Sequence, residues 1–252
     1  MSESADTPYS AERVYGEAWA HDYDDIFDGV DERMIDRLVE LSGSTRRALE
    51  LAVGTGRVAI PLTERGVEVS GLDISESMLA RLAAKPGGEK VRVAQGDMVE
   101  VPVDGRFPLV FVVFNSLFAI STQERQVRCF QNVADHLEPG GRFLVECFVP
   151  DVRRFDSENT RMAVSEIGDN GAYAYEVAIH DPVHQEVRSL HIRTDSNGAN
   201  RVLPVTIRYA WPSELDLMAR LAGLGLESRW AWYDKTEFTE TSTSSVSVYR
   251  KV

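Results

Sequence analysis

A glycine-rich turn and three acidic residues carry the chemistry that this sequence offers. The turn spans residues 54–56 (Gly-Thr-Gly), Glu50 precedes it, and Asp73 and Asp97 follow further along the chain. Glycines let the backbone approach a ligand closely, and a helix that begins after such a turn offers unpaired N–H groups. Alone, the turn fits either a nucleotide site or an ordinary tight connection between a strand and a helix.

The residues around the turn separate two kinds of ligand. A dinucleotide site has the pattern Gly-x-Gly-x-x-Gly, and Ala59 at the third glycine position is an acceptable substitute, so this pattern decides nothing. Glu50 is more informative, because a carboxylate there would repel a pyrophosphate and attract an α-amino or sulfonium group. A nicotinamide dehydrogenase is therefore the weaker interpretation.

The other two acids each follow a predicted strand. Asp73 comes about 20 residues after the turn, where a carboxylate can accept hydrogen bonds from both ribose hydroxyls. Asp97 follows Gly96 and precedes Met98, so that it could hold an adenine amino group while Met98 packs on the ring. Three acids at the ends of successive strands form a specific pattern for an adenosine-containing ligand with a positive charge.

The predicted elements place these residues at one edge of a sheet. Helices are predicted over residues 58–65 and 123–137, with another that begins after Ser75, and buried strands over residues 47–53, 67–72, 91–94, 109–114 and 142–149. This alternation is typical of an α/β fold with a doubly wound parallel sheet. Extended segments over 172–180, 187–194 and 202–209 then predict an antiparallel β meander, followed by a helix over 212–222 and strands over 226–233 and 245–251.

The chain is interpreted as a single domain over residues 1–252. A helical pattern over residues 11–26 carries aromatic residues at every fourth position, continued by Phe27, and a second helix is predicted over 31–41. These two helices form an N-terminal segment, residues 1–45. The cofactor-binding core follows at 46–150, the meander insertion at 151–210, and the last helix and strands at 211–252.

Four segments together resemble the class I S-adenosylmethionine-dependent methyltransferases: residues 50–56, 71–75, 96–98 and 137–141. The resemblance implies a Rossmann-like seven-stranded sheet, with S-adenosyl-L-methionine as cofactor and S-adenosyl-L-homocysteine as product. It also implies a cofactor site. The residues assigned to that site from the core are Glu50, Ala52, Gly54, Gly56, Asp73, Ile74, Met78, Asp97, Met98 and Phe114. In this assignment Phe114 lies near the sulfonium that bears the methyl group.

Within this class the layout is similar to bacterial small-molecule N-methyltransferases, notably those that dimethylate amino groups of nucleotide-linked sugars. Tyr15 and Tyr23 match the family's tyrosine-bearing helical lid and are assigned to the cofactor site, and a meander interrupts the chain as it does there. Such sugar enzymes can carry a histidine shortly after the fourth strand, and residues 115–119 contain none. Because of this departure, the sequence supports neither a sugar as the acceptor nor a histidine base at that position.

Tyr15 and Glu146 are the predicted catalytic residues. Glu146 lies in an apolar strand, so it either receives a substrate amine or pairs with Arg142. In the meander, Tyr173 and Tyr175 share a face that either covers a substrate cavity or is ordinary. The histidines there, at positions 180, 184 and 191, are interpreted as structural, and no His or Cys spacing suggests a metal.

The expected reaction is in-line methyl transfer to an amine of a secondary metabolite or sugar. An amine is favoured because a hydroxyl acceptor would need a stronger base than any that stands out. The alternatives are O- or C-methylation of a natural-product scaffold, and a regulatory protein that binds the cofactor without transfer.

Composition limits the partners. The formal net charge is −13, from 40 acidic and 27 basic residues, which disfavours nucleic acid and anionic membrane as partners. Cys129 and Cys147 are the two cysteines, which indicates neither a disulfide framework nor a zinc site. The first residues lack the features of a signal peptide, so a cytoplasmic protein is expected, with a small-molecule acceptor as its partner. A homodimer is compatible with the sequence.

Overall fold

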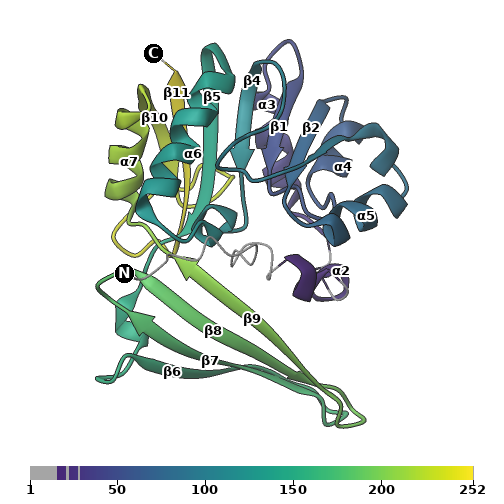
Figure 1. The fold of residues 1–252 in the computed structure, drawn as a ribbon, viewed down its shortest axis with the longest axis vertical. Coiled ribbons are helices and arrows are strands. Elements are labelled where there is room, and N and C mark those ends of the chain that lie inside the picture. The colour runs from purple at the N-terminus through teal and green to yellow at the C-terminus, as the bar shows by residue number, and fades with distance from the viewer. Residues whose placement is uncertain (1–15, 21–22, 28, 252) are drawn as a thin grey trace, which may run out of the picture.

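The computed structural model describes residues 16–20, 23–27 and 29–251, and it contains a seven-stranded and a four-stranded sheet (Figure 1). The larger sheet has the order β10-β11-β5-β4-β1-β2-β3. Its strands are β1 (Arg47–Leu51), β2 (Glu68–Asp73), β3 (Arg92–Gln95), β4 (Phe107–Val112), β5 (Leu137–Phe148), β10 (Leu224–Trp230) and β11 (Ser244–Lys251). Five neighbouring strands are parallel, in the order β3, β2, β1, β4 and β5. Strand β11 is antiparallel to both of its neighbours, β5 and β10.

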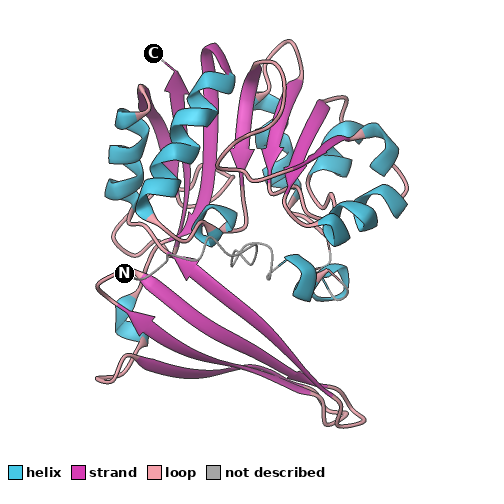
Figure 2. Ribbon diagram, in the orientation of Figure 1, coloured by secondary structure: helices cyan, strands magenta, loops and turns pink. Residues whose placement is uncertain are grey.

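Helices cover both faces of this sheet (Figure 2). They are α3 (Glu32–Leu41), α4 (Ala59–Glu64), α5 (Glu76–Ala84), α6 (Gln123–His136) and α7 (Pro212–Leu221). Alternation along β1 divides the core: Leu49 and Leu51 belong to the hydrophobic cluster that includes α6 and α7, and Ala48 belongs to the cluster that includes α3 and α4. Asp31 and Ser75 cap α3 and α5 with their side chains. The predicted doubly wound α/β fold is confirmed.

The strand order places a ligand-binding edge between β1 and β4. The chain leaves β1 toward β2 and β3 on one side, and β4 then pairs on the other side, so the order reverses at β1. Ligands of open α/β sheets bind outside the carboxyl ends of the strands at such a point. The short 3₁₀ helix η2 (Ser116–Ala119) follows β4 at this edge.

The four-stranded sheet is an antiparallel meander below this edge (Figure 1). Its strands are β6 (Thr160–Ile167), β7 (Tyr173–Asp181), β8 (Glu186–Thr194) and β9 (Asn200–Arg208). The last three confirm the predicted extended segments. Strand β6 was not predicted, because its polar and charged residues hide the alternation that identifies a strand.

The described residues ahead of α3, residues 16–20 and 23–27, lie between the two sheets. Residues 16–19 are helical, the chain turns at Ala20, and α2 (Tyr23–Ile26) follows, so the predicted helix is interrupted. Trp19 packs in one cluster with Met78 of α5 and Leu203 of β9, and this cluster joins the core to the meander. No helix in the described part of the chain has both the length and the apolar content that crossing a bilayer requires.

Candidate active site

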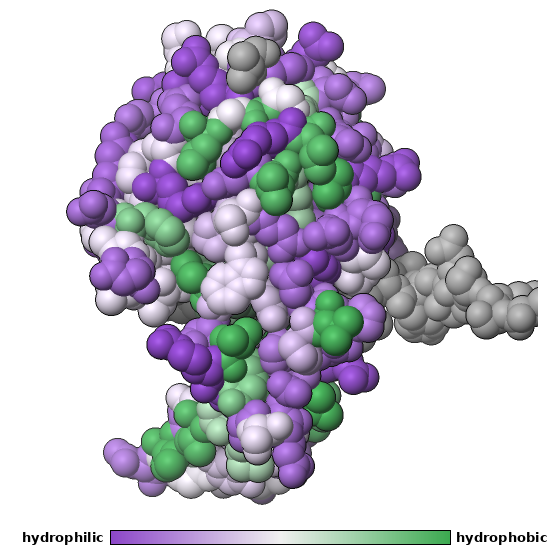
Figure 3. Space-filling view, turned by 90° about the vertical axis from the view of Figure 1, so that its left-hand side faces the viewer, coloured by the Kyte–Doolittle hydropathy of each residue, from purple (hydrophilic) through white to green (hydrophobic). Residues whose placement is uncertain are grey.

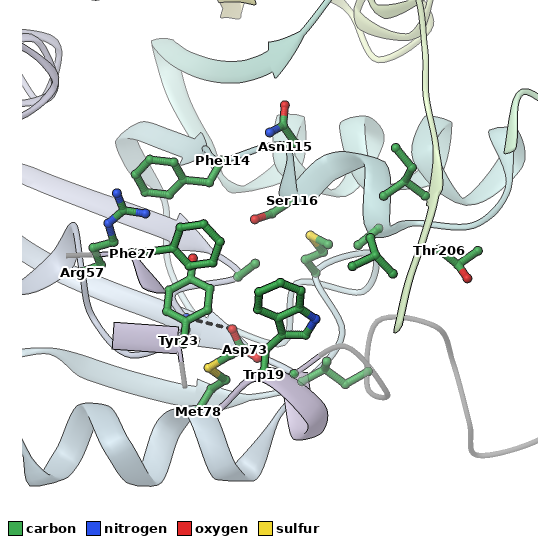
Figure 4. Close-up of a pocket in the computed structure, with 18 of the residues that line it drawn as sticks. Trp19, Tyr23, Phe27, Arg57, Asp73, Met78, Phe114, Asn115, Ser116 and Thr206 are labelled. Atoms are coloured by element: carbon green, nitrogen blue, oxygen red, sulfur yellow. Dashed lines mark hydrogen bonds between the residues drawn. The ribbon is translucent and has the colours of Figure 1, made fainter. Parts of the chain in front are cut away.

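A cavity of about 530 Å³ lies where the core, the N-terminal segment and the meander meet. This volume is within the usual range for small-molecule sites. Strand ends and turns of the core supply one wall, and Figure 4 shows aromatic rings from the N-terminal segment beside it. The predicted cofactor residues that line the cavity are Tyr23, Ala52, Gly54, Asp73, Ile74, Met78, Asp97, Met98 and Phe114.

Asp73 ends β2 and is held by backbone N–H groups. Its Oδ2 accepts a hydrogen bond from Gly54 N and its Oδ1 accepts one from Ser75 N, both at 2.8 Å (Figure 4 draws the former). Burial raises the pKa of Asp73, while these N–H groups oppose the rise by stabilising the carboxylate. Each carboxylate oxygen has a second lone pair, so Asp73 can still accept hydrogen bonds from a ligand diol.

Asp97 lies at the same edge of the sheet, and each of its carboxylate oxygens bonds one protein partner. Its Oδ2 is 2.5 Å from Nη2 of Arg125 in α6, and its Oδ1 accepts a hydrogen bond from Val99 N at 2.8 Å. Met98, which also lines the cavity, is buried beside it. The ion pair fixes the position of the carboxylate, so that Asp97 can accept a hydrogen bond from a ligand donor, such as the adenine amino group, at a defined place.

The glycines of the turn have different tasks. Gly54 lines the cavity with φ +55°, and open space surrounds the position where a Cβ would stand. Gly56 is not among the lining residues. A Cβ there would lie 2.9 Å from Leu82 and 3.1 Å from Ile60, so this glycine permits close packing against α4 and α5, and its contact with the cofactor stays a prediction.

Glu50 also lies away from the cavity wall. It is 2% exposed, and its Oε2 has no hydrogen-bond partner in the described part of the chain. Burial, helped by the neighbouring Asp73, raises the pKa of Glu50 well above its ordinary value. A carboxyl group in this setting favours its protonated form, so the expectation that its charge attracts the ligand directly is not supported.

The loop after β4 is held in an uncommon conformation. Phe114 and Asn115 both have positive φ, at 55° and 63°, and non-glycine residues adopt such angles only where the surroundings impose them. Phe114 N donates to Glu146 Oε2 at 2.5 Å, and Phe148 N donates to Asn115 Oδ1 at 2.6 Å. Strand β5 therefore fixes the loop that presents Phe114 to the cavity.

Glu146 is thereby a positioning group behind the cavity. It is 5% exposed and is not a lining residue, and burial raises its pKa to about 7. The alternative pairing with Arg142 is wrong, since Arg142 Nε lies 3.0 Å from Glu227. Its predicted catalytic role stays a prediction, and in this structure its carboxylate bonds the backbone of the loop after β4.

Arg57 lines the cavity, and it was not predicted from the sequence. Its guanidinium lies over the ring of Phe114, 4.1 Å from the centroid, and its Nε donates to Gly29 O at 2.6 Å (Figure 4). Within the described residues it has no ion-pair partner. Arg57 directly follows the glycine turn and precedes helix α4, and this position could have identified it from the sequence as a cavity residue. A cation here suits an anionic group on the ligand.

The N-terminal segment forms part of the roof of this cavity. Trp19, Tyr23 and Phe27 line it, and the Phe27 ring lies 5.8 Å from Trp19 and 5.0 Å from Tyr23. Asp24 fastens the segment to the glycine turn, because its Oδ1 accepts from both Thr55 Oγ1 and Lys85 Nζ at 2.6 Å. The predicted Tyr15 lies outside the described residues.

The meander supplies the facing wall, which contains His191, interpreted from the sequence as structural, and Glu176, which was not predicted. Glu176 and His191 are directly paired across β7 and β8, and both line the cavity with Ser189. Glu176 forms an ion pair with Arg161 at 2.8 Å. Burial lowers the pKa of His191, which favours the neutral imidazole, although the Glu176 charge opposes the shift.

The other notable residues of the meander do not reach the cavity. Tyr175 points to the opposite face of the sheet from Glu176, and its ring stacks on Tyr173 with centroids 6.2 Å apart. Of the two interpretations left open for this tyrosine pair, the structure therefore favours ordinary strand residues. His180 is buried against Tyr209, with Nε2 and the hydroxyl 2.9 Å apart, and the exposed His184 bonds Asp181. Both are structural, as expected.

Comparisons with known proteins identify a methyltransferase domain and relatives that cover up to 96% of this chain. Residues 48–141 match a family described as a methyltransferase domain. The structure of the CcbJ methyltransferase from Streptomyces caelestis is 36% identical, with a TM-score of 0.87, over 96% of this chain and 99% of that one. The cypemycin N-terminal methyltransferase of a Streptomyces species is 28% identical over 182 residues, which is 71% of this chain and 72% of that protein.

A third relative matches over the core alone. It is the dTDP-3-amino-3,4,6-trideoxy-alpha-D-glucopyranose N,N-dimethyltransferase of Streptomyces venezuelae, 33% identical over 98 residues. These residues make up 39% of this chain and 40% of that protein. The similarity thus extends beyond the core in two of the three relatives.

Proposed function

This chain belongs to the S-adenosylmethionine-dependent methyltransferases, and from that premise we propose that it methylates an amine nitrogen of a small molecule. One observation carries the proposal: a single cavity joins the glycine turn and Asp73 on one wall to Glu176 and His191 on the other. The cofactor wall and the acceptor wall thus face the same space, as group transfer between two ligands requires.

The cofactor wall fits S-adenosylmethionine in the chemistry of its groups. Asp73 and Asp97 offer carboxylate acceptors for the ribose and the adenine amino group, and Met98 offers an apolar surface for the ring. Arg57 offers the opposite charge to the carboxylate of the methionine moiety. When bound, the cofactor supplies a methyl group activated on a positively charged sulfur. The aromatic rings of Trp19, Tyr23 and Phe27 exclude water from this part of the cavity.

The acceptor wall fits an amine. A protonated amine is attracted by the Glu176 carboxylate, and it must lose one proton before its nitrogen can attack. His191 stands beside Glu176 with its pKa lowered, so it can accept that proton at neutral pH. An alcohol holds its proton far more tightly than an ammonium, and a neutral imidazole is a weak base for that task. O- or C-methylation remains the alternative.

Two of the relatives support nitrogen as the accepting atom. The name of one describes N-terminal methylation of cypemycin, and that of the other describes N,N-dimethylation of a dTDP-linked amino sugar. A secondary metabolite with a primary or secondary amine is accordingly the proposed acceptor class.

Matched acceptor pairs test the proposal. The purified protein is incubated with methyl-deuterated S-adenosylmethionine and with amino sugars or their hydroxyl counterparts. Peptides with free or acetylated N-termini form a second series. We expect mass spectrometry to find the label on nitrogen, and only in the amine member of a pair. Label on oxygen or carbon, with the amine unmodified, would overturn the proposal.

A further inference from the structure

Arg161, Glu176 and His191 lie on the cavity side of the meander, on three neighbouring strands. Arg161 of β6 forms an ion pair with Glu176 of β7, and Glu176 is directly paired with His191 of β8. In the register of β6 and β7, Arg161 is opposite Ala178, so it reaches Glu176 along the diagonal, as a long side chain can. A cation, a carboxylate and an imidazole thus follow one another across the sheet.

The ion pair between Arg161 and Glu176 is sheltered from water. Each of the two side chains is 19% exposed, whereas Arg193 and Glu166, which also pair across the meander, are 39% and 49% exposed. Hydrophilic residues cover much of the surface in Figure 3, where water screens their charges. The charges of a sheltered pair act more strongly on a neighbouring group than those of a surface pair do.

A carboxylate beside an imidazole has two opposing effects on the proposed transfer. It attracts the acceptor as an ammonium ion, but it also stabilises the imidazolium form of His191, which cannot accept a proton. Burial lowers the pKa of His191, the Glu176 charge raises it, and the Arg161 charge lowers it again. Arg161 Nη1 donates to Glu176 Oε2 at 2.8 Å, and in the described part of the chain no donor bonds Oε1, so this oxygen remains for the ammonium.

We propose that Arg161 is a positioning residue of the transfer reaction, which holds Glu176 beside His191 and keeps the imidazole unprotonated at neutral pH. This role rests on the proposed function, in which His191 takes a proton from the acceptor. The proton moves from the ammonium nitrogen to an imidazole nitrogen. The electron pair left on the amine nitrogen then forms the bond to the methyl carbon, while the carbon–sulfur bond breaks and its electrons stay on sulfur.

The strands beside His191 carry further charges in the next row of the same side. Arg193 of β8 and Arg201 of β9 are directly paired there, and Arg193 also forms the ion pair with Glu166 at 2.9 Å. Both arginines are more exposed than the sheltered ion pair, so water screens them more strongly. Directly opposite His191, β9 carries the uncharged Leu203.

The N-terminal segment meets His191 through an aromatic ring. The ring of Trp19 lies edge-on to the imidazole, with centroids 5.5 Å apart, and Glu17 of the same segment bonds the first turn of α5. Asp73 and Asp97 of the core line the facing wall of the same cavity. These groups stay in place when a side chain of β6 or β7 is changed, so a comparison of variants isolates the effect of that change.

The first test is a titration of the His191 side chain by nuclear magnetic resonance, in the full chain without added ligand. The chain has five histidines, and the His191 signal is the one that is missing from His191→Gln. Arg161→Gln should raise the pKa of His191 by about 0.5–1 pH unit, and Glu176→Gln should lower it by a similar amount. The two substitutions combined should bring the pKa back toward the wild-type value.

Two variants serve as controls for this titration. Arg161→Lys keeps the positive charge and should leave the pKa of His191 near its wild-type value. Arg188→Gln removes an arginine that pairs with Glu186 and lies on the other side of β8, so it should have no effect. Circular dichroism and affinity for S-adenosylhomocysteine should show each variant folded. A pKa of His191 that falls or does not change in Arg161→Gln would overturn the proposal.

The pH profile of transfer separates the role of Arg161 from the proposed function. For an amine acceptor, the acid limb of kcat/KM should move to higher pH in Arg161→Gln and stay near the wild type in Arg161→Lys. If amines are methylated and the limb of Arg161→Gln follows the wild type, the role of Arg161 is overturned and the proposed function stands. If no amine is methylated, the proposed function fails, and the titration still decides whether Arg161 keeps His191 unprotonated.

Discussion

The backbone N–H of Phe114 donates a hydrogen bond to Glu146 Oε2 at 2.5 Å, which ties the loop after β4 to the neighbouring strand β5. Phe114 lines the cavity and has a positive φ, so this contact holds a strained residue at the active site. The carboxyl group responsible is buried, and its pKa is raised to about 7. The geometry of the site is thereby coupled to a titrating group outside it.

Glu146→Gln should remove a pH dependence of stability. In the wild type the unfolded chain loses the Glu146 proton near pH 4.5 and the folded chain near pH 7. Below pH 4.5 the carboxyl group is protonated in both states, so the free energy cost of burying it is lowest there. The free energy of unfolding should fall as pH rises through this window, by up to about 3 kcal/mol. Glutamine can still accept the Phe114 hydrogen bond and does not titrate. Urea unfolding at several pH values should show this fall in the wild type relative to the variant.

The control for this experiment is Glu64→Gln, at an exposed glutamate of α4. Its stability should follow the wild type at every pH. A difference between the wild type and Glu146→Gln that does not change from pH 4.5 to pH 8 would contradict the assigned role of Glu146.

Asp73→Ala should weaken cofactor binding. Loss of a carboxylate that bonds the ribose costs about 1–3 kcal/mol, which lowers affinity by a factor of about 5–150. Calorimetry with S-adenosylhomocysteine measures the effect, and Asp104→Ala, at an exposed acid outside the cavity, is the control. Near-normal binding by the folded Asp73→Ala protein would show that the ribose lies elsewhere.

Arg57→Gln should weaken binding of one part of the cofactor only. Loss of a charge-assisted contact should reduce affinity for S-adenosylhomocysteine by a factor of about 10–100. Affinity for 5′-methylthioadenosine, which lacks the amino-acid part, should stay unchanged. Equal weakening of both ligands would instead indicate that Arg57 only supports Phe114, on which it stacks.

His191→Gln should slow transfer without loss of cofactor affinity. If the imidazole accepts the amine proton, kcat/KM for the acceptor should fall about tenfold or more, and the acid limb of its pH profile should change. His184→Gln is a matched control, because His184 is exposed on the same meander and bonds Asp181. An unchanged pH profile in His191→Gln would remove His191 from proton transfer.

The cofactor half of the site was predictable because its signals are local. Asp73 ends one strand and Asp97 closely follows the next, and parallel strands bring those ends together. Glu50 pointed to the right ligand class for a reason that the structure does not support. Its position matches the family pattern, but its side chain is buried away from the cavity.

The acceptor half could not be read from the sequence in the same way. Glu176 and His191 meet only because β7 and β8 pair in one register, and a shift of one residue between the two strands would place them on opposite faces of the sheet. No motif fixes that register. Tyr173 and Tyr175 illustrate the same limit, since alternation placed them on a common face without showing which face lined the cavity.

One cavity is expected to hold the cofactor against the core and the acceptor against the meander. A crystal structure with bound S-adenosylhomocysteine is the decisive measurement. Adenosine should lie between Asp73 and Asp97, with the sulfur toward Phe114 and open space between the sulfur and the pair Glu176 and His191. A ligand bound outside this cavity, or a sulfur turned away from the meander wall, would contradict this expectation.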